Sequence, residues 1–366
     1  MIDRFNSLIK ETKNNFVKCS HIESELLWGD TSGVIHPWIS VIIITYKRPD
    51  YFKQAFESVL RQQDVSYPWE ILVMDNNPEE TELLGYIAKK NNRKVRYYRN
   101  KKNLQHEGNI NRGAELARGE WIALLHDDDL LAPDYLILIE QYIKACANWK
   151  KPLAYIKASY IEFQKIEEVL DEQQFENRNI EKKASIKPEL WIETLIRGCG
   201  LTYINSCGSL IHRNRFFEIG GYNDELNPIG DSTLGLIFME KGYSICPAKR
   251  VLGFYRQGDN TSSKKETVLN FLEADTQLRD YLYSRNWRYR LFGKIFGGLQ
   301  FSNSVEVKLK ISNKYCCEHQ DQQDKMISVE EINRIRKYKK YYIRKYALKI
   351  MNVGLQYIYR KGRLKT

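Results

Sequence analysis

Short apolar runs that end in polar side chains constrain the fold of this chain more than any other feature. Runs of this length, bounded by charged or turn-forming residues, are typical of buried strands, and the segments between them are predicted to be helices. Alternating strands and helices predict an α/β fold with a mostly parallel sheet sandwiched by helices. The predicted strands cover residues 40–45, 70–75, 95–98 and 121–125, and the predicted helices cover 50–62, 79–90 and 109–118.

Polar residues stand at the carboxyl ends of three predicted strands. Thr45 and Tyr46 follow the first strand, Asp75 ends the second, and 127–129 is a run of three aspartates after the fourth. Ligands of parallel α/β sheets bind at the carboxyl ends of the strands. We therefore expect these side chains to converge on one site.

The aspartate run has two interpretations. Asp127, Asp128 and Asp129 repel one another and lose solvation where a buried strand becomes a loop, and a divalent cation such as Mg²⁺ offsets both costs because it prefers carboxylate oxygens. The run is then a seat for a metal bound to a diphosphate. The alternative is a solvated acidic turn, in which Asp129 or Asp134 caps the helix that begins near Pro133.

Length and composition bound the class of protein. The 366 residues suffice for one large domain with an extension, or for two domains, and a hydrophobic content of 43% supports a real core. No apolar stretch approaches the roughly 18 residues of a membrane span, and the polar first 18 residues lack a signal-peptide core, so we expect a cytoplasmic protein. The seven cysteines show no paired zinc spacing and are predicted to be reduced thiols. Cys316, Cys317 and His319 make only part of a zinc ligand set.

The basic charge of the chain belongs to its C-terminal end. The net charge is +11, and from Arg334 to Thr366 there are twelve Lys or Arg and no acid. Between Arg334 and Lys349, Tyr and Ile recur at helical spacing among the cations, which favours contact with an anionic membrane surface. The alternatives are a helix that packs its aromatic stripe on the rest of the protein, and binding to nucleic acid.

Beyond Pro133 the pattern loosens, and we expect an exposed connection over 165–187. Helices are then predicted from Pro188 and over 231–241, with strands over 206–211 and 243–252, and from about Ser263 onward the chain is predicted to be helical and polar.

Four motifs suggest a family. Residues 41–49 and 71–78, the stretch 111–122 that leads into 126–129, and residues 219–225 followed by Gly230-Asp231 together resemble the family 2 inverting glycosyltransferases. The resemblance covers about residues 38–262, in the family's order and spacing. It implies a GT-A fold that binds a nucleotide sugar and transfers the sugar in one step with inversion. The implied domains are an N-terminal helix and loop (1–37), a catalytic domain (38–262, with a nucleotide-binding half 38–133 and an acceptor half 134–262) and a helical basic extension (263–366).

The resemblance also implies roles on the donor side. Asp128 falls where the family binds its metal, Mn²⁺ or Mg²⁺, and His126 stands in the first acidic place of that motif. The implied donor-binding residues are Thr45, Tyr46 and Arg48 at the base, Asp75 at the base or ribose, Asp127 and Asp129 at the ribose or a metal-bound water, and Arg256 at the diphosphate.

The implied general base is Asp231, with Gly230 where the family often has glutamate and with Asp224 and Glu225 as rivals. A carboxylate within hydrogen-bond reach takes the proton of an attacking hydroxyl. The alternative role of Asp231 is a helix N-cap. Many relatives have a metal-binding histidine in the loop after residue 252, where this chain offers only the substitutes Gln257, Asp259 and Asn260.

The expected function is transfer from a nucleotide-diphosphate sugar, most simply a UDP-sugar, to a glycan hydroxyl on a lipid-linked surface-polysaccharide intermediate. Such an enzyme would lie in the cytoplasm, peripheral at the inner face of the cell membrane. The alternative is a non-catalytic, nucleotide-sugar-binding partner subunit of a polysaccharide assembly complex. We expect no nucleic-acid partner, because the chain has no recognised nucleic-acid-reading motif.

Overall fold

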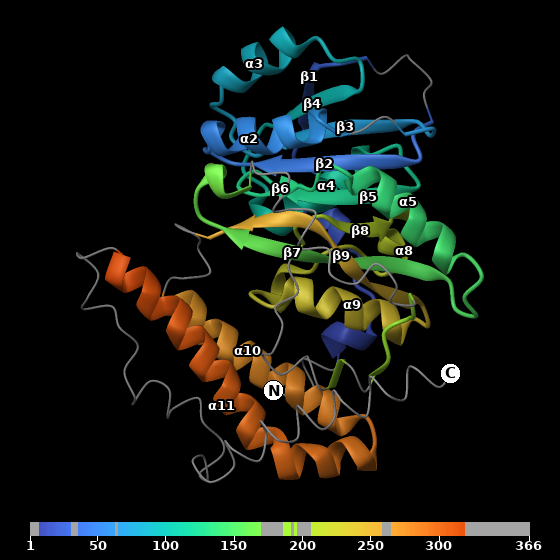
Figure 1. Ribbon diagram of the computed structural model, residues 1–366, viewed down its shortest axis with the longest axis vertical. Helices are drawn as coiled ribbons and strands as arrows, with labels where there is room; N and C mark the ends of the chain where they lie inside the picture. The colour runs from blue at the N-terminus through green and yellow to red at the C-terminus, as the bar shows by residue number, and fades with distance from the viewer. Residues whose placement is uncertain are drawn as a thin grey trace.

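One mixed sheet organises the molecule, which is described here from a computed structural model (Figure 1). The structure describes residues 7–30, 36–62, 65–169, 186–191, 194–195, 206–257 and 265–318. In sheet order the strands are β1 (Ser24–Trp28), β4 (Val95–Asn100), β3 (Trp69–Asp75), β2 (Ile39–Thr45), β5 (Trp121–His126), β8 (Ser209–His212), β7 (Leu153–Phe163), β9 (Ser244–Arg256) and β6 (Leu130–Leu131).

Helices cover both faces of this sheet, so the predicted fold class, a sheet sandwiched by helices with a helical C-terminal extension, is confirmed for the described part of the chain. The helices are α2 (Pro49–Leu60), α3 (Glu82–Lys90), α4 (Gln105–Leu116), α5 (Tyr135–Cys146), α8 (Arg213–Glu218), α9 (Gly230–Glu240), α10 (Lys265–Ser284) and α11 (Trp287–Glu318), with 3-10 turns η1 (Asn15–Cys19), η2 (Ile166–Val169) and η3 (Asp224–Leu226).

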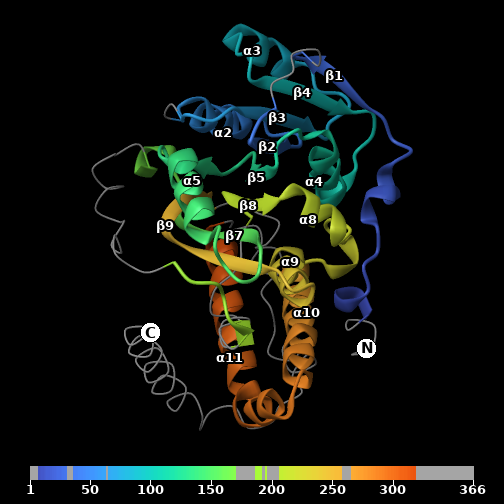
Figure 2. The same cartoon turned by 90° about the vertical axis from the view of Figure 1, so that its right-hand side faces the viewer.

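The parallel core is β4-β3-β2-β5, as the sequence predicts. Every residue of β2 and β3 is buried. Successive side chains of a strand point to opposite faces. Accordingly Ile42 and Ile44 of β2 pack under α4, α8 and α9, whereas Val41 and Ile43 pack under α2, α3 and α5. Figure 2 shows these two helix layers on opposite sides of the sheet.

The rest of the sheet departs from the predicted parallel pattern. Among the described strands, four ladders are parallel and four are antiparallel, the latter joining β1 to β4, β5 to β8, β7 to β8 and β6 to β9. Sequence analysis expected only a helix and a loop where β1 forms, and no strand where β7 forms. Both depend on partners far along the chain, since β1 pairs with β4 and the eleven-residue strand β7 pairs with β9.

The helical extension begins with α10 and α11, which pack side by side at the end of the molecule opposite α3 (Figure 2). No helix of the described ranges is long and apolar enough to cross a membrane. The basic segment 334–349 lies outside the described residues, as do most of the predicted connection 165–187 and part of the predicted helix from Pro188. The domain boundaries at residues 37 and 262 stay predictions.

A buried ion pair joins the amino-terminal ends of the central strands. The Arg96 guanidinium donates from Nε and Nη2 to the Glu70 carboxylate at 2.8 to 3.0 Å, and both residues are more than nine-tenths buried. The same carboxylate accepts from Ser40 Oγ at 2.6 Å and from the Arg118 backbone N–H at 2.9 Å. One side chain thus connects β2, β3, β4 and the turn before β5.

We predict that Glu70→Gln lowers the free energy of unfolding by about 3–5 kcal/mol, because it leaves the Arg96 charge buried without its counter-charge. Denaturant unfolding measures the change. The matched control is Glu25→Gln, which breaks the exposed pair with Lys101 and should change stability little. Equal stability of the two variants would contradict the structural role of this pair.

Candidate functional site

The acidic loop after β5 is attached to the end of β2. The Asp127 carboxylate accepts from Thr45 Oγ1 at 2.9 Å and from the Tyr46 backbone N–H at 3.1 Å. The contact arises because β2 and β5 are parallel and pair Ile44 with His126, so that both strands end at the same edge. Burial, with repulsion from Asp128, raises the Asp127 pKa to about 6.

The other two aspartates have different surroundings. Asp128 forms an ion pair with Arg48 Nη1 at 2.6 Å. Asp129 is fully buried, and its Oδ1 accepts from the Arg256 backbone N–H at 3.0 Å. Its Oδ2 is buried and has no hydrogen-bond partner among the described residues. Burial, and then the Asp128 charge, raises the Asp129 pKa well above its ordinary value.

Three side chains of this loop fit a divalent cation. His126, Asp128 and Asp129 each offer a ligand atom, and these atoms lie within 4.8 Å of one another. A metal ligand must be deprotonated. Burial, together with the charges of His106 and Arg48, lowers the His126 pKa to about 3, so the imidazole is neutral. The unsatisfied Asp129 Oδ2 lies 3.9 Å from His126 Nδ1 and is the kind of orphaned acceptor that a cation satisfies. Sequence analysis placed His126 in this motif and assigned the metal to Asp128.

The predicted base lies on the opposite side of the same histidine. Ser206 Oγ lies 3.1 Å from His126 Nε2 and donates to Asp231 Oδ2 at 3.4 Å. The Tyr222 hydroxyl donates to Asp231 Oδ1 at 3.0 Å. Asp231 is in the first turn of α9 without capping it, and burial raises its pKa against the opposing charge of His106. Ser206 therefore lies between the metal-ligand cluster and the predicted base.

Sequence analysis missed a second histidine. His106 Nε2 lies 3.2 Å from His126 Nε2, and its Nδ1 lies 3.1 Å from the Glu107 carboxylate. Burial acts to lower the His106 pKa, but the bond and charge of Glu107, with the charges of Asp231 and Asp128, raise it overall. The predicted helix began at residue 109, whereas α4 begins at Gln105. The sequence did offer one signal for His106: it follows β4, which ends at the ligand-binding edge of the sheet as β3 and β5 do.

The rival bases Asp224 and Glu225 serve the N-terminal segment instead. Asp224 forms an ion pair with Lys18, and Glu225 lies 3.3 Å from Lys13. The Asn15 backbone N–H and side-chain amide also donate to the Gly220 carbonyl, at 3.0 Å each. The segment around η1 thus holds the turn that carries Tyr222.

The remaining predicted donor residues lie around the same edge. Asp75 pairs in register with Thr45, and its carboxylate accepts from the Asn77 N–H at 2.8 Å and the Tyr97 hydroxyl at 2.7 Å. Burial raises the Asp75 pKa to about 6. Tyr46 is 41% exposed, which leaves its ring accessible.

Arg256 stabilises the acidic loop through contacts with its backbone. Its Nε donates to the Asp128 carbonyl at 2.9 Å and its Nη2 to Gln54 at 2.6 Å, with the guanidinium over the rings of Tyr51 and Phe163. The possible substitute ligands Asp259 and Asn260 lie outside the described residues, and the Gln257 backbone N–H donates to a carbonyl of β7.

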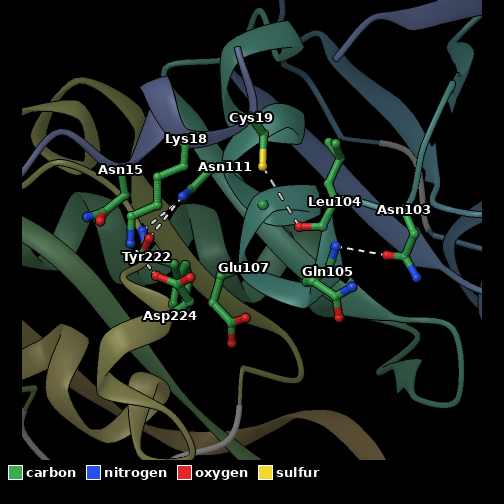
Figure 3. Close-up of a pocket in the computed structure, with 11 residues that line it drawn as sticks. Asn15, Lys18, Cys19, Asn103, Leu104, Gln105, Glu107, Asn111, Tyr222 and Asp224 are labelled. Atoms are coloured by element: carbon green, nitrogen blue, oxygen red, sulfur yellow. Dashed lines mark hydrogen bonds and ion pairs between the residues drawn. The ribbon is translucent and has the colours of Figure 1, made fainter. Parts of the chain in front are cut away.

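A small pocket is lined mostly by polar residues, among them Tyr222, whose hydroxyl contacts the base (Figure 3). Its volume is about 200 Å³, and it lies between η1, the first turns of α4 and the turn at Tyr222. Glu107 and Tyr222 line it, and these are the residues that contact His106 and Asp231. Asn15 also lines it, and its Oδ1 is buried without a partner in the described part of the chain.

Comparison with known proteins finds relatives for part of this chain. Residues 40–175 match the family described as Glycosyl transferase family 2. The matched region is similar to this family and contains the acidic loop with the strands β3 and β5 and all but the first residue of β2. An uncharacterized glycosyltransferase of Methanocaldococcus jannaschii is 32% identical over 103 residues, which are 27% of this chain and 35% of the relative. The Campylobacter jejuni GalNAc(5)-diNAcBac-PP-undecaprenol beta-1,3-glucosyltransferase is 30% identical over 106 residues, which are 29% of this chain and 34% of the relative.

Both matches span about a third of the relative's length. A crystal structure of S. aureus TarS in complex with UDP aligns with a TM-score of 0.49 at 12% identity, covering 80% of this chain and 76% of the other.

We predict that Asp129→Asn and His126→Ala each weaken Mn²⁺ binding at least about tenfold, because each removes a ligand from the cluster. Calorimetric titration of the folded protein with Mn²⁺ measures this. Asp50→Asn is the matched control, since Asp50 is an exposed carboxylate outside the cluster. Unchanged Mn²⁺ affinity in both cluster variants would rule out this ligand set.

Proposed function

We propose that the chain is a metal-dependent inverting glycosyltransferase, which moves a sugar from a nucleotide-diphosphate donor, most simply a UDP-sugar, to a glycan hydroxyl. The observation that carries the proposal is the connection from the cluster through Ser206 to Asp231. A metal-supported leaving group and a general base must face the same anomeric carbon from its two sides, and this arrangement provides both within one site.

The donor would lie along the carboxyl ends of β2, β3 and β5. In this proposal Thr45, Tyr46 and Asp75 contact the base and ribose, with the exposed Tyr46 ring available for stacking. Arg48 already faces the acidic loop and supplies a cation near the diphosphate. Mn²⁺ or Mg²⁺ held by His126, Asp128 and Asp129 would supply Lewis-acid stabilisation of the diphosphate charge.

The acceptor would react beside Asp231. Its hydroxyl oxygen bonds to the anomeric carbon as the bond from that carbon to the diphosphate oxygen breaks, and the hydroxyl proton passes to the Asp231 carboxylate. The Tyr222 and Ser206 hydroxyls hold this carboxylate in place by hydrogen bonds. Burial raises its pKa, which makes it a stronger proton acceptor than an exposed aspartate.

We further propose a lipid-linked acceptor at the cytoplasmic face of the membrane. Two features support it: the name of the Campylobacter jejuni relative includes undecaprenol-linked diphosphate, and the segment 334–349 is basic and rich in tyrosine. A non-catalytic nucleotide-sugar-binding subunit is the competing function. It would bind the donor and never release nucleotide in the presence of any acceptor.

Asp231→Asn should abolish transfer while leaving donor affinity within a few-fold, because loss of one general base costs about 10² to 10⁴ in rate. Nucleotide release with a panel of nucleotide sugars and Mn²⁺ measures transfer. Asp224→Asn and Glu225→Gln are the controls, since both carboxylates pair with lysines outside the site. Normal transfer by Asp231→Asn, with loss in either control, would identify another base.

The pH profile gives the same prediction a second readout. The base acts as a carboxylate, and its folded pKa is raised, so kcat should fall on acidification at a pH above the ordinary aspartate range near 4. Asp231→Glu should move this acidic limb without removing it. A limb that stays in place in Asp231→Glu would belong to another group.

Truncation after Ile332 should weaken binding to anionic vesicles and spare Mn²⁺-dependent donor binding, because it removes all twelve cations of the tail. Co-sedimentation at low and high salt measures this, since salt screens exposed charges. Activity should survive better on a short soluble acceptor than on a lipid-linked one. Equal vesicle binding of the full-length and truncated proteins would leave the tail as packing for the rest of the protein.

A further inference from the structure

The first turns of α11 expose an unusual set of side chains. Trp287 is 68% exposed, Leu291 50% and Ile295 44%. Single exposed apolar residues are ordinary on a protein surface, whereas a contiguous set marks an interaction site. These three stand four residues apart, which places them on one face of a helix. They are three of the seven large apolar side chains that are exposed among the described residues.

Cations flank this apolar face on both sides. At 3.6 residues per turn, Arg290 and Lys294 fall on one side of the three apolar residues and Arg288 on the other, all within an arc of about 160°. All three cations are exposed. The sequence contains no acid from Arg285 to Val305. The surface is therefore apolar along its middle and positive along both edges, and we call these six residues the α11 face.

The opposite side of the same turns is occupied by packing. Tyr289 and Phe292 pack against the core under α9 and α10. A Cβ at Gly293 would lie 2.5 Å from the Tyr283 ring, so the helix approaches α10 closely there. This contact fixes the rotation of α11 and turns the α11 face outward. Figure 2 shows the start of α11 at the end of the molecule that is opposite α3.

We propose that the α11 face binds an anionic lipid bilayer, with the apolar residues in the interfacial region and the cations at the lipid phosphates. A helix with an apolar face bordered by Lys and Arg lies in the plane of a membrane surface, and Trp is favoured at that depth. The positive edges are complementary to lipid phosphates. They disfavour a second copy of this chain, because its α11 face carries the same positive edges. Contact of the α11 face with a membrane would bring the enzyme to the surface that carries a lipid-linked acceptor. The inference rests on the proposed function in this respect only.

The test uses the full-length protein and co-sedimentation with vesicles of phosphatidylglycerol and phosphatidylcholine in equal parts. The variant Trp287→Ser/Leu291→Ser/Ile295→Ser should reduce binding at least about tenfold, since burying one such side chain is worth that much. The matched control is Leu190→Ser, which removes an exposed apolar side chain elsewhere and should bind as the unaltered protein does.

The charge arm of the test is Arg288→Gln/Arg290→Gln/Lys294→Gln. Each cation strengthens binding about fivefold, so this variant should bind anionic vesicles on the order of a hundredfold more weakly, with no change in its binding to pure phosphatidylcholine vesicles. Free inorganic phosphate at millimolar concentration should not release the unaltered protein, which separates a lipid surface from a simple phosphate site.

Unchanged vesicle binding by the apolar variant would overturn the proposal and leave the C-terminal segment as the membrane contact. A dimer that the apolar variant converts to monomer, without an effect on vesicles, would overturn it in favour of a second copy. The result is independent of the transfer reaction. Vesicle binding that depends on the α11 face would stand even if no donor were ever turned over, and transfer to a soluble acceptor should be equal in all these variants.

Discussion

The site depends on the hydrogen bonds that Asp127 accepts from the end of β2. Three adjacent carboxylates at a strand end would otherwise spread apart, because each one loses solvation and repels the next. The fold resolves this by giving every carboxylate a different partner: Thr45 and Tyr46 for Asp127, Arg48 for Asp128, and the Arg256 backbone for Asp129. Among the fully buried oxygens of this run, Asp129 Oδ2 has no hydrogen-bond partner in the described part of the chain, so it has the most to gain from a cation.

The pKa values of the two histidines are shifted in opposite directions. Burial and the neighbouring cations lower the His126 pKa, whereas the bond and charge of Glu107 raise the His106 pKa. A neutral His126 ring can ligate a cation on the side of the acidic loop, and the charge of His106 acts to lower the pKa of Asp231. The ring of His126 thus separates the region suited to a cation from the region suited to a carboxylate that must accept a proton.

Local patterns made the parallel core and most of the predicted site residues accessible from sequence. The strands β2, β3 and β5 are short buried runs, and parallel pairing alone brings Thr45, Asp75 and Asp127 to one edge. The long strand β7 was not predictable in this way, because half-buried residues hide its period and its partner β9 lies far along the chain. His106 was missed for a related reason: its role depends on a contact between the start of α4 and the end of β5, which no local spacing reveals.

The region that matches the family includes neither the N-terminal segment nor the base. Residues 40–175 contain the acidic loop and every predicted donor-binding residue except Arg256, but Asp231 lies after this region and η1 lies before it. Asn15 and Lys18 reach across to Gly220 and Asp224, so the first part of the chain restrains the turn that orients the base. Grafting the matched region alone into another protein would carry over the donor half of the chemistry and leave the proton acceptor and its support behind.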